Sequence, residues 1–310
     1  MLMATEQQRT QIIIKASWVA IIGNAVLSVL KIVVGLISGS ISVVADGVDS
    51  ASDIITSLVT LLTARIISKP PNPNFAYGYG KADTVAAKAL SFIIFFAGAQ
   101  LALSTIDNIL NPAERDLPGI ISVYIIIISI VGKFALAWYL NKTGKKIDSQ
   151  MLIVNGRNMQ NDVVISVSVL IGLGFTFWFE LPILDTITAL LVSFYIMFIA
   201  FRIFMQTNRD LMDGISDTEI YKNIIEIVNS VDGAHNPHRI RVRKLANLYL
   251  VALDLEIDGN LSLNQAHEIS NQVDALIKEK IDNIYDVLIH VDPKGIEEDE
   301  AYGVSESDLK

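Results

Sequence analysis

Three aspartates recur at helical spacing inside an otherwise apolar stretch of the sequence. Asp46, Asp49 and Asp53 stand at positions i, i+3 and i+7. A helix therefore places them on one face, within about 60° of one another. A charged side chain near the centre of a bilayer costs at least about 2.5 kcal/mol on insertion scales. If this stretch spans a membrane, these carboxylates must face a polar cavity, be protonated or bind a cation.

A second apolar stretch repeats the spacing. Asn155, Asn158 and Asp162 also stand at i, i+3 and i+7. Asn158 and Asp162 lie one helical turn apart, as do Asp49 and Asp53. Two facing helices that each offer two oxygen-bearing side chains one turn apart form a four-ligand metal site of the kind built in bundle cores. We therefore predict a transport site for a metal ion at these four residues.

The ligands of the predicted transport site are all oxygens. Three carboxylates and one amide carbonyl suit Mn²⁺, Mg²⁺, Ca²⁺ and also Fe²⁺, whereas Zn²⁺ and Cu⁺ favour imidazole or thiolate. The chain has no cysteine, and none of its four histidines lies in an apolar stretch. Asp46 is an accessory candidate, because it could bond a helix end or assist protons instead of touching the metal.

Six stretches are long and apolar enough to carry these residues across a membrane. The chain is 52% hydrophobic and 18% charged, whereas a soluble domain carries about 25% charge. A helix that crosses the ~30 Å hydrocarbon core needs ~20 mainly apolar residues. The predicted spans are Ile12–Ile37, Ile41–Ile67, Asp83–Ile109, Gly119–Leu140, Met151–Trp178 and Leu181–Met205. We expect a six-helix membrane domain over residues 1–214, with no cleavable signal peptide.

Positive charge is unequal between alternate loops. The second and fourth loops and the two ends of the membrane domain carry Lys and Arg, whereas the first, third and fifth loops hold only Arg115. By the positive-inside rule, both termini should be cytoplasmic in a multi-pass protein of the cell (inner) membrane. The remaining polar residues of the spans are expected to be structural or to lie at span ends; they include Lys31, Lys88 and Lys133, of which the first two could snorkel.

The C-terminal part of the chain has the composition of a small, acidic soluble domain. Residues 1–214 hold 15 Lys and Arg against 14 Asp and Glu, and the remainder holds 9 against 19. Nucleic acid is excluded as a partner, because phosphate contacts need Lys and Arg. We predict the element order αββαβ over residues 215–293, followed by an acidic disordered tail at 294–310. The elements are Thr218–Val228, Arg239–Arg243, Leu248–Ile257, Ser262–Ile281 and Val287–Val291.

Together these features resemble the cation diffusion facilitator family. The residues that match its pattern are Asp49, Asp53, Asn158, Asp162 and Gly78–Ala82. The resemblance implies a homodimeric antiporter, not an enzyme, that exports a divalent metal from the cytoplasm in exchange for protons, and it implies a ferredoxin-like C-terminal domain. The zinc branch typically has histidine at the position of Asn158. The chain therefore resembles the manganese-exporting branch.

The resemblance implies three further features. A salt bridge between Lys81 and Asp213 would lock the dimer at the membrane surface. The histidines of a second zinc site before the third span correspond to Phe75 and Tyr79, so that site is expected to be absent. The positions that bind regulatory metal in zinc-transporting relatives are His235, Asp254, His267, His290 and Asp292, with plain surface polarity as the alternative interpretation.

Several alternatives stay open at this point. Within the transporter class, Fe²⁺ and Zn²⁺ remain possible cargoes beside Mn²⁺, and no cofactor is expected. A passive cation channel would need a continuous polar path, whereas polar residues at one level of the membrane favour a carrier. An intramembrane aspartyl protease would need a dyad from two helices, which aspartates one turn apart on one helix do not form.

Overall fold

The computed structural model describes residues 2–67, 69–111, 116–147, 149–215, 218–245, 248–295 and 302–309. The chain forms two compact units: Met1–Ala64 with Ala86–Phe204, and Arg65–Val85 with Met205–Lys310. Arg115 and the acidic run Glu297–Glu300 of the predicted tail lie outside the described residues.

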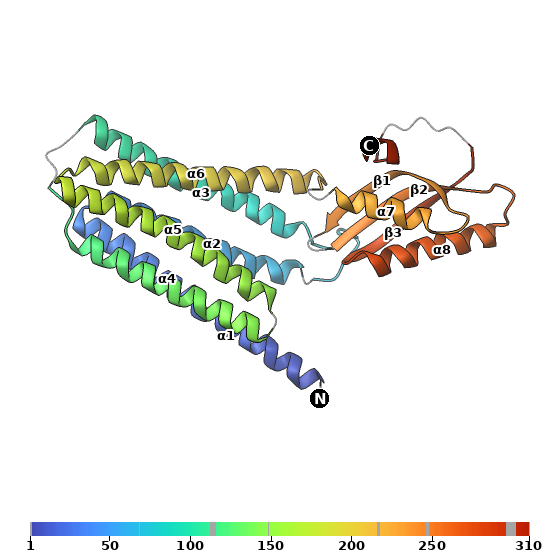
Figure 1. Ribbon diagram of the computed structural model, residues 1–310, viewed down its shortest axis with the longest axis horizontal. Coiled ribbons are helices and arrows are strands. Elements are labelled where there is room, and N and C mark those ends of the chain that lie inside the picture. The colour runs from blue at the N-terminus through green and yellow to red at the C-terminus, as the bar shows by residue number, and fades with distance from the viewer. Residues whose placement is uncertain are drawn as a thin grey trace. The chain divides into compact units, whose positions relative to one another are not determined.

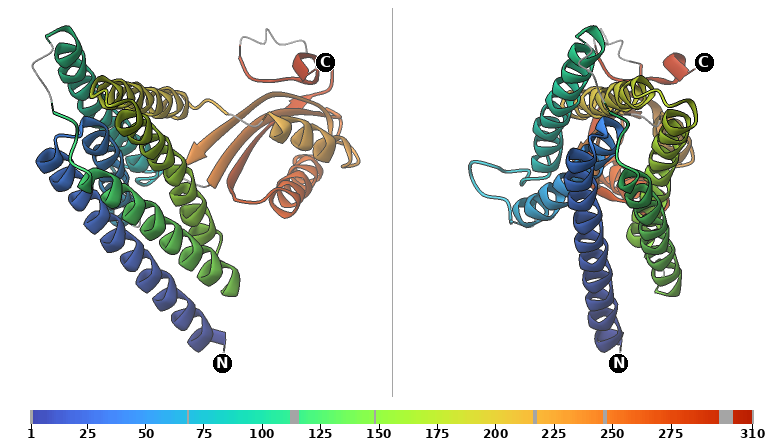
Figure 2. Two further views of the ribbon diagram at one scale, coloured as in Figure 1. Left: turned by 60° about the vertical axis from the view of Figure 1, so that its left-hand side comes forward. Right: turned by 90° about the vertical axis from the view of Figure 1, so that its left-hand side faces the viewer.

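Six long helices form most of the described part of the first unit (Figures 1 and 2). They are α1 (Leu2–Ser38), α2 (Ile41–Ile67), α3 (Ala82–Leu110), α4 (Ile121–Lys146), α5 (Gln150–Phe179) and α6 (Ile183–Leu211). One predicted span corresponds to each helix. The helices α1, α4 and α6 continue past the apolar ends of their spans, because hydropathy marks the segment in the lipid and not the end of the helix.

The helices have the character of membrane spans. Among the described residues, α1, α3, α4, α5 and α6 are long and apolar enough to cross a membrane. The helix α2 has 27 residues and carries the three aspartates. The helix α4 packs against both α1 and α5 (Figures 1 and 2). Polar side chains of these helices can therefore meet inside the bundle.

The helices α1 and α2 approach each other closely at Gly47. A Cβ atom added at Gly47 would lie 3.0 Å from the backbone nitrogen of Ile32. The hydroxyl of Ser28 donates a hydrogen bond to the Gly47 carbonyl oxygen at 2.9 Å. Because Gly47 directly follows Asp46, this approach holds the start of the aspartate stripe against α1.

Asp185 of α6 caps the start of α2. Its side chain is only 2% exposed. The backbone N–H of Ile41 donates to Asp185 Oδ2 at 2.7 Å, and the hydroxyls of Ser40 and Ser42 both donate to Oδ1. One carboxylate thus satisfies an otherwise free N–H of the helix start and joins two helices that are distant in sequence.

Replacing Asp185 by alanine is expected to destabilise the helical unit. The Ile41 N–H and two hydroxyls would lose their acceptor, at a cost of about 1–3 kcal/mol for each buried group left unpaired. Thermal unfolding of the purified chain in detergent measures this loss. Asp116→Ala, at an exposed position, is the matched control and should leave the unfolding temperature unchanged. Equal unfolding temperatures for the two variants would contradict the capping role.

The second unit contains a three-stranded sheet in its described residues. Its elements are α7 (Glu219–Asn229), β1 (His235–Leu245), β2 (Leu248–Ile257), α8 (Leu263–Lys280) and β3 (Ile284–Pro293). The strand order is β1-β2-β3, with β1 antiparallel to β2 and β2 parallel to β3. The predicted αββαβ order is confirmed. Ser262 caps α8 in a reciprocal capping box with Gln265, which stabilises the helix start.

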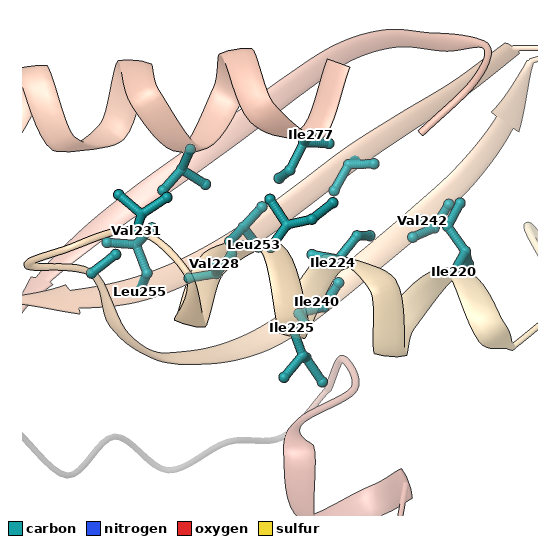
Figure 3. Packing of buried hydrophobic residues seen from close by; sticks show 14 of the residues in the cluster. Ile220, Ile224, Ile225, Val228, Val231, Ile240, Val242, Leu253, Leu255 and Ile277 are labelled. Carbon is teal, nitrogen blue, oxygen red and sulfur yellow. The ribbon is translucent and has the colours of Figure 1, made fainter. Parts of the chain in front are cut away.

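The two helices cover one face of this sheet with an aliphatic core (Figure 3). Ile224 of α7, Leu253 of β2 and Ile277 of α8 are all fully buried. On β1, Ile240 and Val242 are buried, whereas Arg241 between them is partly exposed. The alternating pattern of β1 therefore separates a core face from an arginine face, as predicted.

The described C-terminal residues 302–309 contact β1 through Val304 and Tyr302 and differ from the disordered tail that we expected. Ile240 and Val304 exchange two backbone hydrogen bonds of 3.0 Å. The Tyr302 ring lies under the guanidinium groups of Arg239 and Arg241, 4.8 and 5.2 Å from its centroid. Leu309 packs against the core of the domain. The prediction of disorder rested on the acidic composition of the tail and did not take into account the apolar residues after the acidic run, which make these contacts.

Gly303 permits this pairing, and Gly303→Ala is expected to release the segment. Gly303 has φ +99°, and an added Cβ would lie 2.5 Å from the Cα of Arg239. Hydrogen exchange of the Ile240 amide in the full chain should accelerate at least about tenfold in the variant. Gly295→Ala is the control, because Gly295 also has a positive φ of +88° but open space around it. Unchanged protection in Gly303→Ala would contradict the pairing.

Candidate metal centre

Three of the four predicted transport-site residues meet inside the helical unit. Asp49 and Asp53 of α2 and Asp162 of α5 each place a carboxylate oxygen within 4.8 Å of the others. Two oxygens bound to one divalent cation at about 2.0–2.6 Å lie no more than about 4–5 Å apart. The spacing therefore fits a single ion. Asn158 lies one turn before Asp162 on α5, and its side chain is exposed in the single chain.

The cluster contains an unsatisfied buried acceptor. Asp49 is 8% exposed. Asp53 Oδ2 is buried and accepts no hydrogen bond from any described residue. A buried carboxylate oxygen without a donor is costly in an apolar surrounding. Together with the two neighbouring carboxylates, this oxygen forms a set of ligands that would bind a hard cation.

Asp46 does not belong to this cluster. Its side chain is fully buried. The ammonium of Lys31 lies 3.0 Å from Asp46 Oδ2, and the hydroxyl of Ser166 donates to its Oδ1 and Oδ2 at 2.9 and 3.0 Å. The structure therefore gives Asp46 a role that the sequence analysis did not consider: its side chain joins α2 to α1 and α5.

Two lysines inside the bundle were assigned too weak a role from the sequence. Lys31 and Lys133 are both fully buried, so the expected snorkelling of Lys31 is wrong. Lys31 Nζ donates to Ser50 Oγ at 2.6 Å and to the Asp46 carbonyl at 3.0 Å. Lys133 Nζ lies 3.2 Å from Asp162 Oδ2. A lysine in the middle of a span needs a carboxylate partner. This requirement could have indicated from the sequence that both lysines pair with aspartates of the spans.

The second compact unit holds a second cluster of metal-ligand type. His238, Asp254 and Asp292 bring one ligand atom each within 4.8 Å of one another. His290, one of the residues proposed from the resemblance, has its Nε2 3.1 Å from Asp292 Oδ1. Two others, His235 and His267, are exposed and lie outside this cluster. The sequence interpretation therefore missed His238.

Two arginines already neutralise part of this second cluster. Arg239 and Arg241 each place a guanidinium nitrogen near Asp254, at 3.1 and 3.2 Å. A metal ion at Asp254 would compete with both cations. The competition makes this second cluster less suited to a cation than the aspartate cluster, where one lysine opposes three carboxylates.

The expected bridge between Lys81 and Asp213 forms within one chain. Lys81 Nζ lies 2.5 Å from Asp213 Oδ1, and Arg243 Nε lies 2.9 Å from Asp213 Oδ2. All three residues belong to the second compact unit. The sequence interpretation missed Arg243, which sits on the arginine face of β1. Asp213 thus receives one cation on each carboxylate oxygen.

Comparison with known proteins identifies both parts of the chain. Residues 17–212 match the model of the cation efflux transmembrane domain, and residues 216–294 match that of the cytoplasmic, dimer-forming domain of cation efflux proteins. The metal-bound C-terminal domain of the CzcD transporter from Thermotoga maritima is 35% identical and covers 26% of this chain and 93% of its own, with a TM-score of 0.25.

Curated relatives are similar over most of the chain. The manganese efflux system protein MneS of Bacillus subtilis is 30% identical over 264 residues, which cover 84% of this chain and 89% of the relative. The cation-efflux pump FieF of Salmonella typhi is 31% identical over 267 residues, or 86% and 88% of the two chains. The chain therefore belongs to the cation diffusion facilitator family: it is a multi-pass, homodimeric efflux transporter of divalent cations and not an enzyme.

Proposed function

We propose that the protein exports Mn²⁺ from the cytoplasm in exchange for protons, with Asp49, Asp53, Asn158 and Asp162 as its transport site. The observation that carries this proposal is the meeting of three carboxylates within 4.8 Å in the helical unit. Such a cluster offers a divalent ion three charged oxygen ligands, and Asn158 adds an amide oxygen from the same face of α5.

The ligand chemistry favours Mn²⁺ as the cargo. Carboxylate and carbonyl oxygens suit Mn²⁺, whereas Zn²⁺ prefers sites that contain imidazole or thiolate. The similarity to a protein named as a manganese efflux system supports the same choice. Fe²⁺ has a similar ligand preference and is the second candidate cargo. Zn²⁺ is the third, because an oxygen site lacks the softer ligands that zinc selects.

Proton exchange follows from the charge of the cluster. Three neighbouring carboxylates repel one another when no cation is bound, so the empty site gains stability by taking up protons. A bound dication reverses this preference and expels them. Because the same oxygens carry either cargo, the site can hold metal or protons but not both. Movement of the site between inward-facing and outward-facing states then exchanges metal for protons across the membrane.

The remaining assignments are part of the same proposal. We place the transporter in the cell (inner) membrane with both termini in the cytoplasm, because the basic residues gather in alternate loops. The membrane domain comprises residues 1–214, and the cytoplasmic domain comprises 215–293. The bridge of Lys81 and Asp213 stabilises the dimer at the membrane surface. The cluster of His238, Asp254 and Asp292 is the candidate for regulatory metal.

Metal uptake into proteoliposomes with an imposed pH gradient tests the proposal. Mn²⁺, Fe²⁺ and Zn²⁺ are compared for the wild-type chain and for Asn158→His. Saturable Mn²⁺ flux that stops when a protonophore collapses the gradient is the expected result, with zinc flux gained in Asn158→His. Flux that does not depend on the pH gradient would indicate a channel and contradict the exchange mechanism. Equal Zn²⁺ and Mn²⁺ flux in the wild type would contradict the choice of cargo.

A further inference from the structure

A lysine ammonium occupies the edge of the aspartate cluster. Lys133 of α4 is fully buried, and its Nζ lies 3.2 Å from Asp162 Oδ2. The ammonium also interacts electrostatically with Asp53, Asp46 and Asp49. A site that attracts cations therefore contains a fixed cation of its own, which lowers its affinity for any metal.

Lys133 differs from the other buried lysine in how it is held. Lys31 Nζ donates to Ser50 Oγ and to the Asp46 carbonyl, so it is anchored to α2 by hydrogen bonds in addition to its ion pair. Lys133 Nζ makes no hydrogen bond of good geometry to any described residue. Its one ion pair among the described residues is with the Asp162 carboxylate. Lys31 and Asp46 thus form a closed structural pair, whereas Lys133 contributes charge to the cluster.

The charges of the cluster add up to the charge of the cargo. The closed pair of Lys31 and Asp46 is neutral. Asp49, Asp53 and Asp162 carry three negative charges when ionised, and Lys133 carries one positive charge. The remaining charge is −2, which one divalent cation neutralises completely.

We propose that Lys133 sets the valence of the transported cation. A loaded site of zero net charge crosses the low-dielectric interior at the smallest electrostatic cost. With Lys133 in place, a monovalent ion leaves the site at −1 and a trivalent ion leaves it at +1. The neutral loaded site therefore favours transport of a dication over that of a monovalent or a trivalent ion, and the positive charge of Lys133 keeps the binding of the dication weak enough for release. This inference rests on the transport site proposed above.

The test compares the binding of Mn²⁺ and Tb³⁺ to the purified full chain in detergent. Tb³⁺ is a hard trivalent ion that accepts the same oxygen ligands, and its luminescence reports binding directly. Only the binding that is lost in the Asp53→Asn variant is assigned to the transport site. This subtraction removes any signal from the cytoplasmic cluster. The readout is the ratio of Tb³⁺ affinity to Mn²⁺ affinity.

Removing the ammonium is expected to shift this ratio toward the trivalent ion. Coulomb energy scales with the charge of the ion, so a gain of about tenfold for Mn²⁺ in Lys133→Met implies a gain of about thirtyfold for Tb³⁺. The ratio should therefore rise about threefold. Lys133→Gln should raise the ratio by a similar factor, and it replaces Lys133→Met in the test if that variant does not fold. Lys133→Arg keeps the charge and should keep the wild-type ratio.

Two charge-balanced variants separate valence from packing. Lys133→Met with Asp162→Asn restores the site charge to −2 without the lysine, and its ratio should return toward the wild type. Lys31→Met with Asp46→Leu removes the closed pair without changing the site charge, so the ratio should not move. Asp162→Asn alone leaves −1, and its ratio should shift toward Mn²⁺.

The outcomes distinguish this inference from the proposed function. If the wild type shows no Mn²⁺ binding that depends on Asp53, the transport site is wrong and the role of Lys133 falls with it. If that binding is present but the ratio is the same in the wild type and in folded Lys133→Met or Lys133→Gln, only the valence role is overturned. If neither lysine-free variant folds, a ratio in Asp162→Asn that fails to shift toward Mn²⁺ overturns it.

Discussion

Asp53→Asn is expected to reduce the flux of Mn²⁺ into proteoliposomes by at least about a hundredfold, because it removes a full negative charge about 2–3 Å from the bound dication. The amide keeps the size of the carboxylate. Asp53 Oδ2 accepts no hydrogen bond from any described residue, so changing this atom to an amide nitrogen leaves no described donor without its acceptor. The loss should therefore be one of metal binding and not of folding.

Asp107→Asn is the matched control for this prediction. Asp107 lies on α3, is exposed, and accepts a hydrogen bond at 2.8 Å from Asn111, which follows the last residue of the helix. Its replacement changes the net charge of the chain by the same amount at a distance from the cluster. Flux in this variant should match the wild type. Near-normal flux in Asp53→Asn, with the control also normal, would remove Asp53 from the transport site.

The spacing of Asp46, Asp49 and Asp53 predicted a common helix face, and their shared face on α2 follows from helix geometry alone. Spacing does not determine how far α2 rotates about its axis when it packs. The close approach at Gly47 brings Asp46 to Lys31 of α1, whereas Asp49 and Asp53 meet Asp162 of α5. One stripe is thereby divided between a structural pair and a metal cluster, and only tertiary packing makes that division.

The cytoplasmic cluster shows a second limit of sequence patterns. His235 was selected from the family resemblance, and the alternating strand predicted at Arg239–Arg243 included neither His235 nor His238. The pairing of β1 with β2 shifts register on both sides of His238, and Asn236 and Arg239 have positive φ angles of 43° and 49°. A shift of one residue turns side chains to the opposite face. His238 therefore joins Asp254 and Asp292, and His235 does not.

Lys31→Met is expected to destabilise the helical unit by about 3–5 kcal/mol, because removing one partner of a buried ion pair leaves the other charge uncompensated. Asp46 would keep the hydrogen bonds from Ser166 but lose the ammonium at 3.0 Å. Methionine nearly preserves the length and packing of the lysine stem, so the loss reports the charge and not a cavity. Thermal unfolding of the purified chain in detergent measures the change.

The double variant Lys31→Met with Asp46→Leu is the control that isolates the unpaired charge. Replacing both partners by apolar groups of similar size removes the buried carboxylate together with its counter-ion, so most of the lost stability should return. Ser50 and Ser166 each lose a partner in the double variant, which predicts a remaining deficit of about 1–3 kcal/mol. If the double variant were no more stable than Lys31→Met alone, the cost would lie in packing around Lys31, and Asp46 would not depend on its ammonium for charge compensation.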